Sequence, residues 1–461
     1  MRRQLQPRIS RSCPWHTRCI SSSFDARAYE LSASSQPSRV IFGAGVAATQ
    51  LGSLSRASGM RKVLLVRDRD DVAASRSKFA EYLLMQAGVP CFQYTLQWDC
   101  ATVDGVNHAA AMAQRVGADG IVAFGGGNTM DMARAVSVVL ACGGCASDFL
   151  SVGKKDSEDN GLQLQQQKFE TTPLLLMPTI AGSGAEMAKP TLLWNEETEA
   201  KLFFAAEVDI VPQVLDGVMV MNLSRAVIID PTLMVTVPLH LTVQGALTAL
   251  GQCLESYLLG GADDALALEG LEAVARALAA PLREGKLDLR GAFLREQFAW
   301  GSLLSGITAN SSGTGAARAL AVSMSSISDL PHMQLAAAFL PFVLDRYIEL
   351  ANENEGDPFF DELREKLGDV ANRLTAASGF EGSNAATWLR YVTKRFDLPP
   401  PSTLELEESL LNLCVHRAAE FQQESMNICR SDGNSAIIES DDLHAIIDGA
   451  ILQHQTSSGS K

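Results

Sequence analysis

The residues best suited to bind a ligand form a glycine-rich turn that joins a predicted strand to a predicted helix. The apolar run 121–124 predicts a buried strand, and Gly125, Gly126 and Gly127 follow it without Cβ atoms that would block close approach. Asn128 is a residue type that caps helices, and apolar residues at helical spacing follow it. The bare N–H groups and the helix dipole favour an anion there. The spacing therefore predicts a phosphate site, with a tight turn that binds nothing as the alternative.

A second loop rich in Gly, Ser and Thr follows another predicted buried strand, 174–177. This loop, 178–186, contains Thr179 and Ser183 and could lie over a phosphate or a substrate. Asp68, like Thr179, comes just after the end of a predicted strand. Open parallel sheets bind ligands beyond the carboxyl ends of their strands, so we expect these loops to share one site.

Strand and helix patterns alternate in the first half of the chain, and helical patterns alone fill the second half. Strands are expected at 39–42, 62–66, 91–96, 121–124, 174–177 and 226–229, helices at 47–59, 75–87 and 106–116, and a hairpin across 191–194 and 201–205. This alternation predicts parallel strands covered by helices on both faces. The fold expected is an α/β domain over residues 34–235, followed by an all-helical domain over 236–455. The cleft between them is the expected site.

Composition excludes several classes of protein. With 461 residues and 47% hydrophobic residues, the chain is long enough for two or three globular domains. A net charge of −15 argues against a nucleic-acid partner, and no apolar run approaches the length of a membrane helix. The nine cysteines lack a disulfide spacing, which suits a reducing compartment. We interpret Cys142 and Cys145 as loose thiols rather than as a redox or zinc pair.

The N-terminus differs from the rest of the chain. Its first 24 residues hold five arginines and no acidic residue, a bias typical of a mitochondrial or plastid transit peptide. Pro7 and Pro14 interrupt a long amphipathic helix, so the alternative is a disordered cytosolic extension. We therefore assign residues 1–33 to an extension, expect the mitochondrial matrix with the cytoplasm as alternative, and expect a disordered tail at 456–461.

Taken together, the motifs resemble those of the iron-containing alcohol dehydrogenases, with maleylacetate reductase as the nearest-looking branch. The segment 37–45 resembles the start of maleylacetate reductases, and the resemblance continues to about residue 455. Residues 125–134, GGGNTMDMAR, are similar to the family's GGGSxxDxAK, and 178–186 to its PTTAGTGSE. Residues 228–233 match the segment that opens its helical domain.

This resemblance implies a dehydroquinate-synthase-like fold with NAD or NADP across the glycine turn. The implied cofactor-binding residues are Asp68, Gly125, Gly126, Gly127, Asn128, Asp131, Thr179, Ser183 and Lys201. At Asp68 a carboxylate would bond the ribose 2′-hydroxyl, which favours NAD, whereas Arg67 and Arg69 could instead pair with the 2′-phosphate of NADP. The alternatives are a loop-starting aspartate at 68 and a solvated strand lysine at 201. A homodimer or larger homo-oligomer is an expectation from the family alone.

The metal centre is where the sequence departs from this family. Metal-dependent members carry an Asp and a His four residues apart, then two further histidines. Here Thr248 and Gln252 stand at the first pair, Arg318 at the third ligand, and only His332 remains. The histidine that usually lies near the nicotinamide is replaced by Val322. Because first-row metals need several anionic or imidazole ligands, the sequence predicts no catalytic iron or zinc.

Arg318 and His332 are the candidate catalytic residues. A fixed cation and an imidazole that donates a proton could replace the Lewis acid, and an arginine also suits a carboxylated substrate. The predicted substrate is therefore a keto acid or an enone acid. The structural alternatives are an ion pair for Arg318 and a helix-start histidine for His332.

We thus expect an NAD(P)-dependent oxidoreductase of a small oxo compound, without a catalytic metal. Two other functions remain open: a nucleotide-binding pseudoenzyme, and a non-redox lyase or cyclase on the same fold. An additional segment around 208–221 could be a lid or an oligomer contact, and the sequence does not decide between them.

Overall fold

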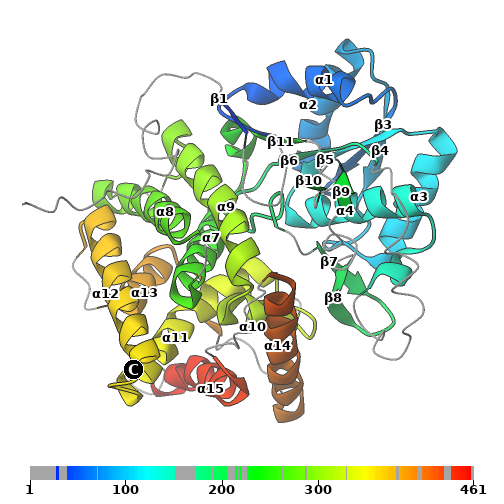
Figure 1. Ribbon diagram of the computed structural model, residues 1–461. Coiled ribbons are helices and arrows are strands. Elements are labelled where there is room, and N and C mark those ends of the chain that lie inside the picture. Colours follow the sequence, from blue (N-terminus) through cyan, green and yellow to red (C-terminus); the bar gives the residue numbers. More distant parts are fainter. Residues whose placement is uncertain are drawn as a thin grey trace, which may run out of the picture.

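A sheet region and a helical region lie side by side in the computed structural model (Figure 1). The structure describes residues 27–30, 39–69, 71–150, 172–188, 191–204, 213–215, 218–220, 226–260, 263–285, 288–328, 330–380, 384–401, 407–429 and 438–457. This confirms the predicted combination of an α/β region with an all-helical region.

The sheet has seven strands in the order β1-β2-β11-β6-β5-β3-β4. Its strands are β1 (Arg27–Glu30), β2 (Arg39–Phe42), β3 (Val63–Arg67), β4 (Cys91–Thr95), β5 (Gly120–Gly125), β6 (Leu174–Pro178) and β11 (Ala226–Ile229). All neighbouring strands are parallel except β1, which runs antiparallel to β2. Every residue of the central strands β5 and β6 is buried, as their continuous apolar runs predicted.

Strand β1 corrects the assignment of residues 1–33 to an extension. It pairs Arg27 with Phe42 and Glu30 with Arg39, and so covers the backbone edge that β2 would otherwise expose. Its four residues, RAYE, lack the continuous apolar run from which the other short strands were predicted. The arginine-rich residues 1–24 lie outside the described residues.

Helices cover both faces of the sheet, and β3 shows how alternate side chains serve each face. These helices are α1 (Val46–Ala57), α2 (Asp71–Gln86), α3 (Val103–Val116) and α4 (Gly127–Cys142). Val63 and Leu65 pack in one hydrophobic cluster with α1 and α2, whereas Leu64 and Val66 pack in another with α3 and α4. Helix α3 begins earlier than expected because the Thr102 hydroxyl accepts a bond from the Gly105 N–H, 2.9 Å away.

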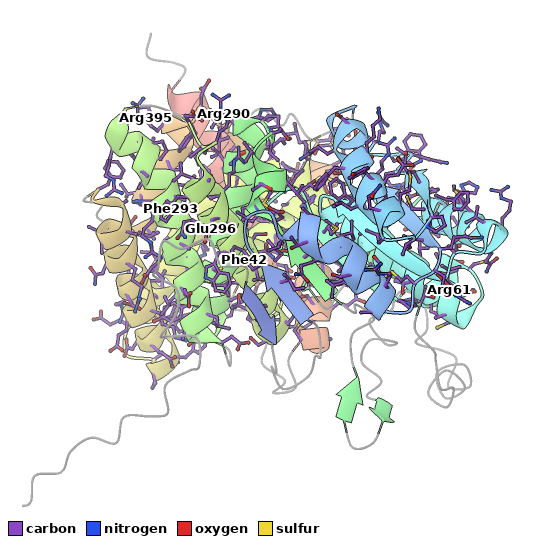
Figure 2. All side chains as sticks on the ribbon, turned by 90° about the horizontal axis from the view of Figure 1, so that it is seen from above. Phe42, Arg61, Arg290, Phe293, Glu296 and Arg395 are labelled. Carbon is purple, nitrogen blue, oxygen red and sulfur yellow. The ribbon has the colours of Figure 1, made fainter. Side chains whose placement is uncertain are left out.

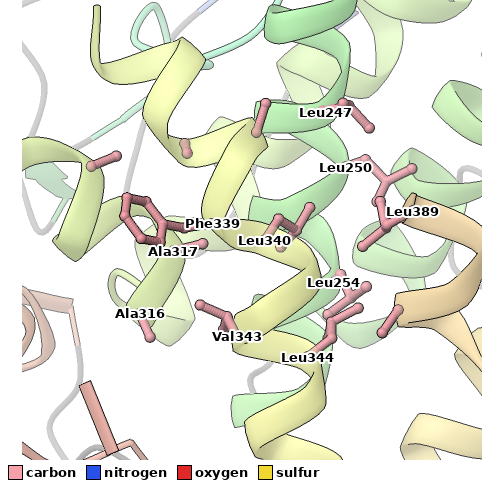
Figure 3. Close-up of a cluster of buried hydrophobic side chains, with 14 of the residues drawn as sticks. Leu247, Leu250, Leu254, Ala316, Ala317, Phe339, Leu340, Val343, Leu344 and Leu389 are labelled. Atoms are coloured by element: carbon pink, nitrogen blue, oxygen red, sulfur yellow. The ribbon is translucent and has the colours of Figure 1, made fainter. Parts of the chain in front are cut away.

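The helical region begins after a short 3₁₀ turn, η3 (Pro231–Met234). Its helices are α7 (Leu239–Leu259), α8 (Asp264–Glu284), α9 (Ala292–Ser312), α10 (Ala316–Met324), α11 (His332–Glu353), α12 (Pro358–Ser378), α13 (Ala385–Arg395), α14 (Glu408–Cys429) and α15 (Ser440–Ser457). Figure 3 shows their core, where Leu250 and Leu254 of α7 meet Leu340 and Leu344 of α11 and Leu389 of α13. Each of these buried leucines contributes about 1.5–3 kcal/mol to folding.

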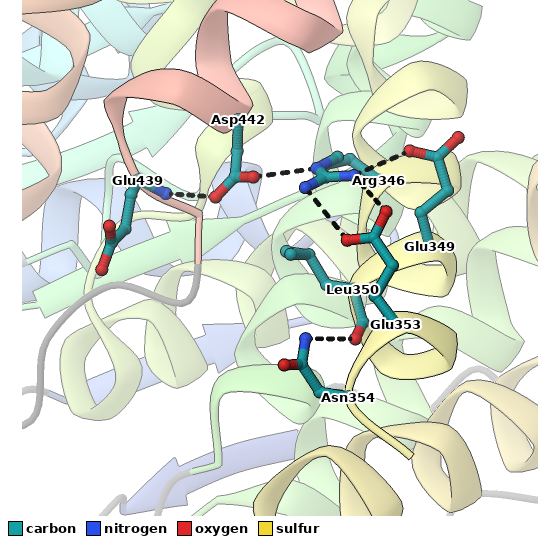
Figure 4. A network of polar contacts seen from close by, with 7 residues as sticks. All are labelled: Arg346, Glu349, Leu350, Glu353, Asn354, Glu439 and Asp442. Carbon is teal, nitrogen blue, oxygen red and sulfur yellow. Dashed lines mark hydrogen bonds and ion pairs between the residues drawn. The ribbon is translucent and has the colours of Figure 1, made fainter.

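Arg346 ties the C-terminal helix α15 to α11 (Figure 4). Its guanidinium donates to Asp442 of α15 at 2.8 Å and also meets Glu349 and Glu353 of its own helix at 3.1 and 3.3 Å. Asp442 in turn accepts from the Glu439 N–H at 2.9 Å. A carboxylate that bonds the backbone at the start of α15 is thus held by a cation of α11.

Two small hairpins lie outside the large sheet. The predicted hairpin is confirmed as β7 (Thr191–Asn195) and β8 (Ala200–Phe204). Within the segment 208–221 the structure describes a second hairpin, β9 (Gln213–Leu215) and β10 (Val218–Val220), which stands apart from the sheet in Figure 2. The predicted loop at 153–170 lies outside the described residues. The predicted disordered tail is wrong at residues 456 and 457, which belong to α15, and its residues 458–461 lie outside the described residues. None of the helices described is long and apolar enough to cross a membrane.

Candidate active site

The glycine turn lies between the end of β5 and the start of α4. A Cβ atom at Gly125 would come within 2.6 Å of Asp68 Oδ1, and one at Gly127 within 2.7 Å of Ser183 Oγ, so a larger residue at either position would displace these side chains. Gly126 is more open, because its Cβ would first meet Ile180 Cδ1 at 3.4 Å. Of the three glycines, Gly126 therefore has the most space beside it.

Asp68 lies directly against this turn. Its Oδ2 accepts from the Gly126 N–H at 2.9 Å, and its Oδ1 accepts from the Thr129 hydroxyl. A carboxylate at the start of α4 is favoured by the helix dipole. The structure brings Asp68 to the turn that the sequence selected, and its contact with a ribose stays a prediction.

Asn128 does not cap α4 as the sequence suggested. The helix begins at Gly127 with Gly126 as its N-cap, and the Asn128 amide donates to the Asp99 carbonyl at 2.6 Å. Among the described residues no side chain caps this helix start. Its first-turn N–H groups have no carbonyl within the helix, which is the arrangement that binds phosphates.

The loop after β6 joins the glycine turn to the helical region. The Thr179 N–H donates to the Gly125 carbonyl at 2.8 Å, and the Gly182 N–H donates to Ser302 of α9 at 2.7 Å. Gly184 has a φ of +61°, and a Cβ there would lie 2.6 Å from the Ser302 carbonyl oxygen. In the described part of the chain the buried Thr179 hydroxyl has no hydrogen-bond partner, which fits a polar ligand over this loop.

Four charged or titratable side chains meet where this loop approaches the helices. Asp131 comes from α4, Lys201 from β8, Arg318 from α10 and His332 from the start of α11. Burial raises the pKa of Asp131 to about 7, although Arg134, Arg318 and Lys201 all oppose that shift. The sequence had named each of the four, and the structure places them within electrostatic reach of one another.

The two candidate catalytic residues and Lys201 have lowered pKa values. Burial lowers the pKa of Arg318, partly offset by Asp131. For His332, burial lowers the pKa well below 6.5, and the neighbouring cations Lys201 and Arg318 lower it further. Burial also lowers the pKa of Lys201 from 10.5, against the attraction of Cys100 and Asp131. His332 is therefore neutral at pH 7, while Arg318 keeps its charge.

The positions at which the sequence lacked metal ligands form hydrogen bonds of their own. The Thr248 hydroxyl donates to the Gln244 carbonyl at 2.8 Å, and Val322 lies in the hydrophobic core of the helical region. With its amide oxygen toward Arg318, Gln252 accepts from Nη1 at 2.8 Å, and its amide nitrogen donates to the Ser183 carbonyl at 3.3 Å. With a guanidinium, an amide and a hydroxyl at three of the four positions, the residues present do not fit an iron or zinc site.

Elsewhere among the described residues, no group of three or more His, Cys, Asp or Glu side chains could hold a metal ion. Cys142 and Cys145 are free thiols, as expected.

Two residues of the site were missed from the sequence. Cys429, at the end of α14, lies close enough to Arg318 to raise its pKa. Arg134 donates to the Ala185 carbonyl at 2.6 Å and also to that of Ala188, and so holds the loop after β6. Arg134 could have been noticed, because it ends the glycine motif. For Cys429 the sequence carries no signal, since more than a hundred residues separate it from Arg318.

Comparison with known proteins gives the same architecture. The model of the iron-containing alcohol dehydrogenases matches residues 37–215, and the model of the C-terminal domain of that family matches residues 242–420. Alcohol dehydrogenase 4 of Saccharomyces cerevisiae is 25% identical over 321 residues, 69% of this chain and 74% of its own. The NAD-dependent methanol dehydrogenase of Bacillus methanolicus is 22% identical over 90% of this chain and 98% of its own.

Among solved structures, the sulfoacetaldehyde reductase of Bifidobacterium kashiwanohense in complex with NAD⁺ superposes with a TM-score of 0.69. The match covers 91% of this chain and 98% of that one, at 18% identity. At this identity the similarity concerns the fold.

Proposed function

The chain belongs to the iron-containing alcohol dehydrogenase family, and from that premise we propose that it is an NAD-dependent reductase of a small oxo acid that works without a metal. The observation that carries this proposal is the contact between Gln252 and Arg318, at the positions where the resemblance would place metal ligands. A guanidinium there supplies a fixed positive charge that would pair with the carboxylate of an oxo acid.

The cofactor would supply the hydride, and the chain would position it. The first turn of α4 would bind the pyrophosphate, and Thr179 would offer its unpartnered hydroxyl. Asp68 favours NAD over NADP because a carboxylate repels a 2′-phosphate.

The neighbouring arginines also make contacts within the protein. Arg67 donates to Gln93 at 3.1 Å and to the Asp68 carbonyl at 3.0 Å. Arg69 donates to the Gln97 carbonyl at 3.1 Å. These bonds use only some of the five N–H donors of each guanidinium, so the preference for NAD is proposed from Asp68 alone.

Arg318 and His332 would hold the substrate. Arg318 keeps its charge in a buried place, where a carboxylate that lost its water would gain most from it. The neutral imidazole of His332 would donate an N–H bond to the carbonyl oxygen without adding a second full charge.

Lys201 is the better source of the proton than His332. A neutral imidazole does not readily give up its remaining proton, whereas an ammonium group whose pKa is lowered toward the working pH does. Asp131, with a pKa of about 7, would return a proton to Lys201 after each turnover. This assigns the hydrogen bond to His332 and the proton transfer to Lys201.

The test compares oxo acids with neutral aldehydes of the same length, using NADH and EDTA-treated enzyme. Arg318→Met should lower kcat/KM for the acids by about 10- to 100-fold and leave the neutral aldehydes almost unchanged. Arg61→Met is the matched control, because Arg61 is exposed at the far end of the sheet region (Figure 2). Equal losses for both substrate classes would contradict the proposal. Binding of NADH without turnover of any oxo compound would favour the pseudoenzyme.

On sequence grounds alone we also propose the mitochondrial matrix as location and a homo-oligomer as assembly. Fusion of residues 1–33 to a reporter should direct it to mitochondria, and light scattering should give a mass of at least two chains. A cytosolic reporter or a monomer would contradict these two proposals respectively.

A further inference from the structure

Gln252 occupies a place between the cofactor side and the substrate side of the site. It lies on α7 and is 7% exposed. Its amide can have only one orientation, because a guanidinium only donates and a backbone carbonyl only accepts. The oxygen must therefore face Arg318, 2.8 Å away, and the nitrogen must face the Ser183 carbonyl, 3.3 Å away.

Ser183 connects this pair to the glycine turn. Its hydroxyl oxygen lies 2.7 Å from the point where a Cβ of Gly127 would be, so the loop and the turn are in van der Waals contact. A continuous path therefore runs from Gly127 through Ser183 and Gln252 to Arg318. The two ends of this path are the predicted phosphate site and the predicted carboxylate site.

The same helix also holds the start of α10, which carries Arg318. Glu255, one turn after Gln252, accepts from the Ala317 N–H at 3.3 Å and faces the N-cap Gly315. Helix α7 thus fixes both the backbone on which Arg318 stands and the guanidinium at its end. Glutamine is suited to the second task because it accepts one N–H and leaves the positive charge intact.

We propose that Gln252 is a positioning residue that fixes the Arg318 guanidinium relative to the loop beside the predicted phosphate site, and so selects oxo acids by the spacing of their carboxylate and carbonyl. This inference rests on the proposed function. A glutamate at this position would neutralise Arg318, and an apolar side chain would release its guanidinium from the loop.

The experiment uses the full chain and three variants. Gln252→Glu should raise KM for oxo acids by about 10-fold or more, with KM for neutral aldehydes and Kd for NADH changed less than about threefold. Gln252→Met keeps the volume and the charge state, and should lower kcat for oxo acids and relax the preference for one chain length. Gln86→Glu, on the exposed end of α2, is the matched control for the added charge.

Binding of succinate, a dicarboxylate that cannot be reduced, separates this inference from the proposed function. Its effect on the melting temperature of the NADH complex reports the carboxylate site without turnover. Succinate stabilisation that is present in the wild type and lost in Gln252→Glu supports the inference, even if no oxo acid is reduced. An equal rise in KM for oxo acids and neutral aldehydes in Gln252→Glu, or unchanged binding of succinate by this variant, would overturn the inference.

Discussion

Replacing the buried Glu255 with glutamine should change how the stability of the protein depends on pH. Glu255 is 2% exposed on α7, and burial raises its pKa from 4.5 to about 7, against the N–H groups of Ala317 and Ala316 and the Tyr347 hydroxyl. The folded state therefore binds a proton more tightly than the unfolded state does. The stability that this group contributes is complete below about pH 4.5 and is lost as the pH rises to about 7.

The size of the effect follows from the shift. A rise of the pKa from 4.5 to about 7 corresponds to about 3 kcal/mol as an upper bound, most of which falls between pH 5 and pH 8. Glutamine keeps the shape and cannot ionise. As the pH rises from 5 to 8, the free energy of unfolding of Glu255→Gln should therefore increase by about 2–3 kcal/mol relative to that of the wild type.

Urea unfolding at both pH values, followed by circular dichroism, measures this difference. Glu296→Gln is the control, because it removes an exposed carboxylate of α9 (Figure 2) and should leave the difference unchanged. A difference that is independent of pH, or that moves against the variant at pH 8, would refute the reasoning.

Three further predictions concern the site itself. Gly127→Ala should weaken NADH binding by about 10-fold or more, since the new methyl group meets Ser183; unchanged nicotinamide fluorescence on titration would refute this. Lys201→Met should lower kcat by about 100-fold and remove the fall of kcat at high pH, whereas an unchanged pH profile would exclude Lys201 as the proton donor. Asp68→Asn should improve kcat/KM for NADPH relative to NADH by removing a charge beside the ribose, and an unaltered ratio would count against Asp68 as the selective residue.

Local patterns in the sequence predicted most of the architecture. Continuous apolar runs followed by glycine or threonine predicted strands β5 and β6. The ends of these strands lie side by side as expected, and the Thr179 N–H donates to the Gly125 carbonyl. Strand β1 was missed because its residues, RAYE, form no continuous apolar run and its partner lies nine or more residues ahead. The prediction of Asn128 as a helix cap was wrong because the helix already begins at Gly127, with Gly126 as its N-cap. The Asn128 amide donates to the Asp99 carbonyl instead.

The residues of the candidate site were predicted from the sequence, but the hydrogen bonds between them were not. The resemblance named Asp131, Lys201, Arg318 and His332, and the fold brings them together from four separate elements. The sequence treated Gln252 only as a lost metal ligand. Its bonds to Ser183 and Arg318 join residues more than sixty positions apart, and such pairs depend on how α7 packs against the loop and α10. Burial, which sets the pKa of His332, is likewise a property of the assembled fold.

The most direct test of the account is a titration of the purified protein with NADH in the presence and absence of EDTA, followed by turnover of oxo acids under both conditions. The account predicts enhanced nicotinamide fluorescence and reduction of an oxo acid, both unaffected by EDTA. Loss of turnover with EDTA, restored by Fe²⁺ or Zn²⁺, would show that a metal does the work assigned here to His332 and Lys201.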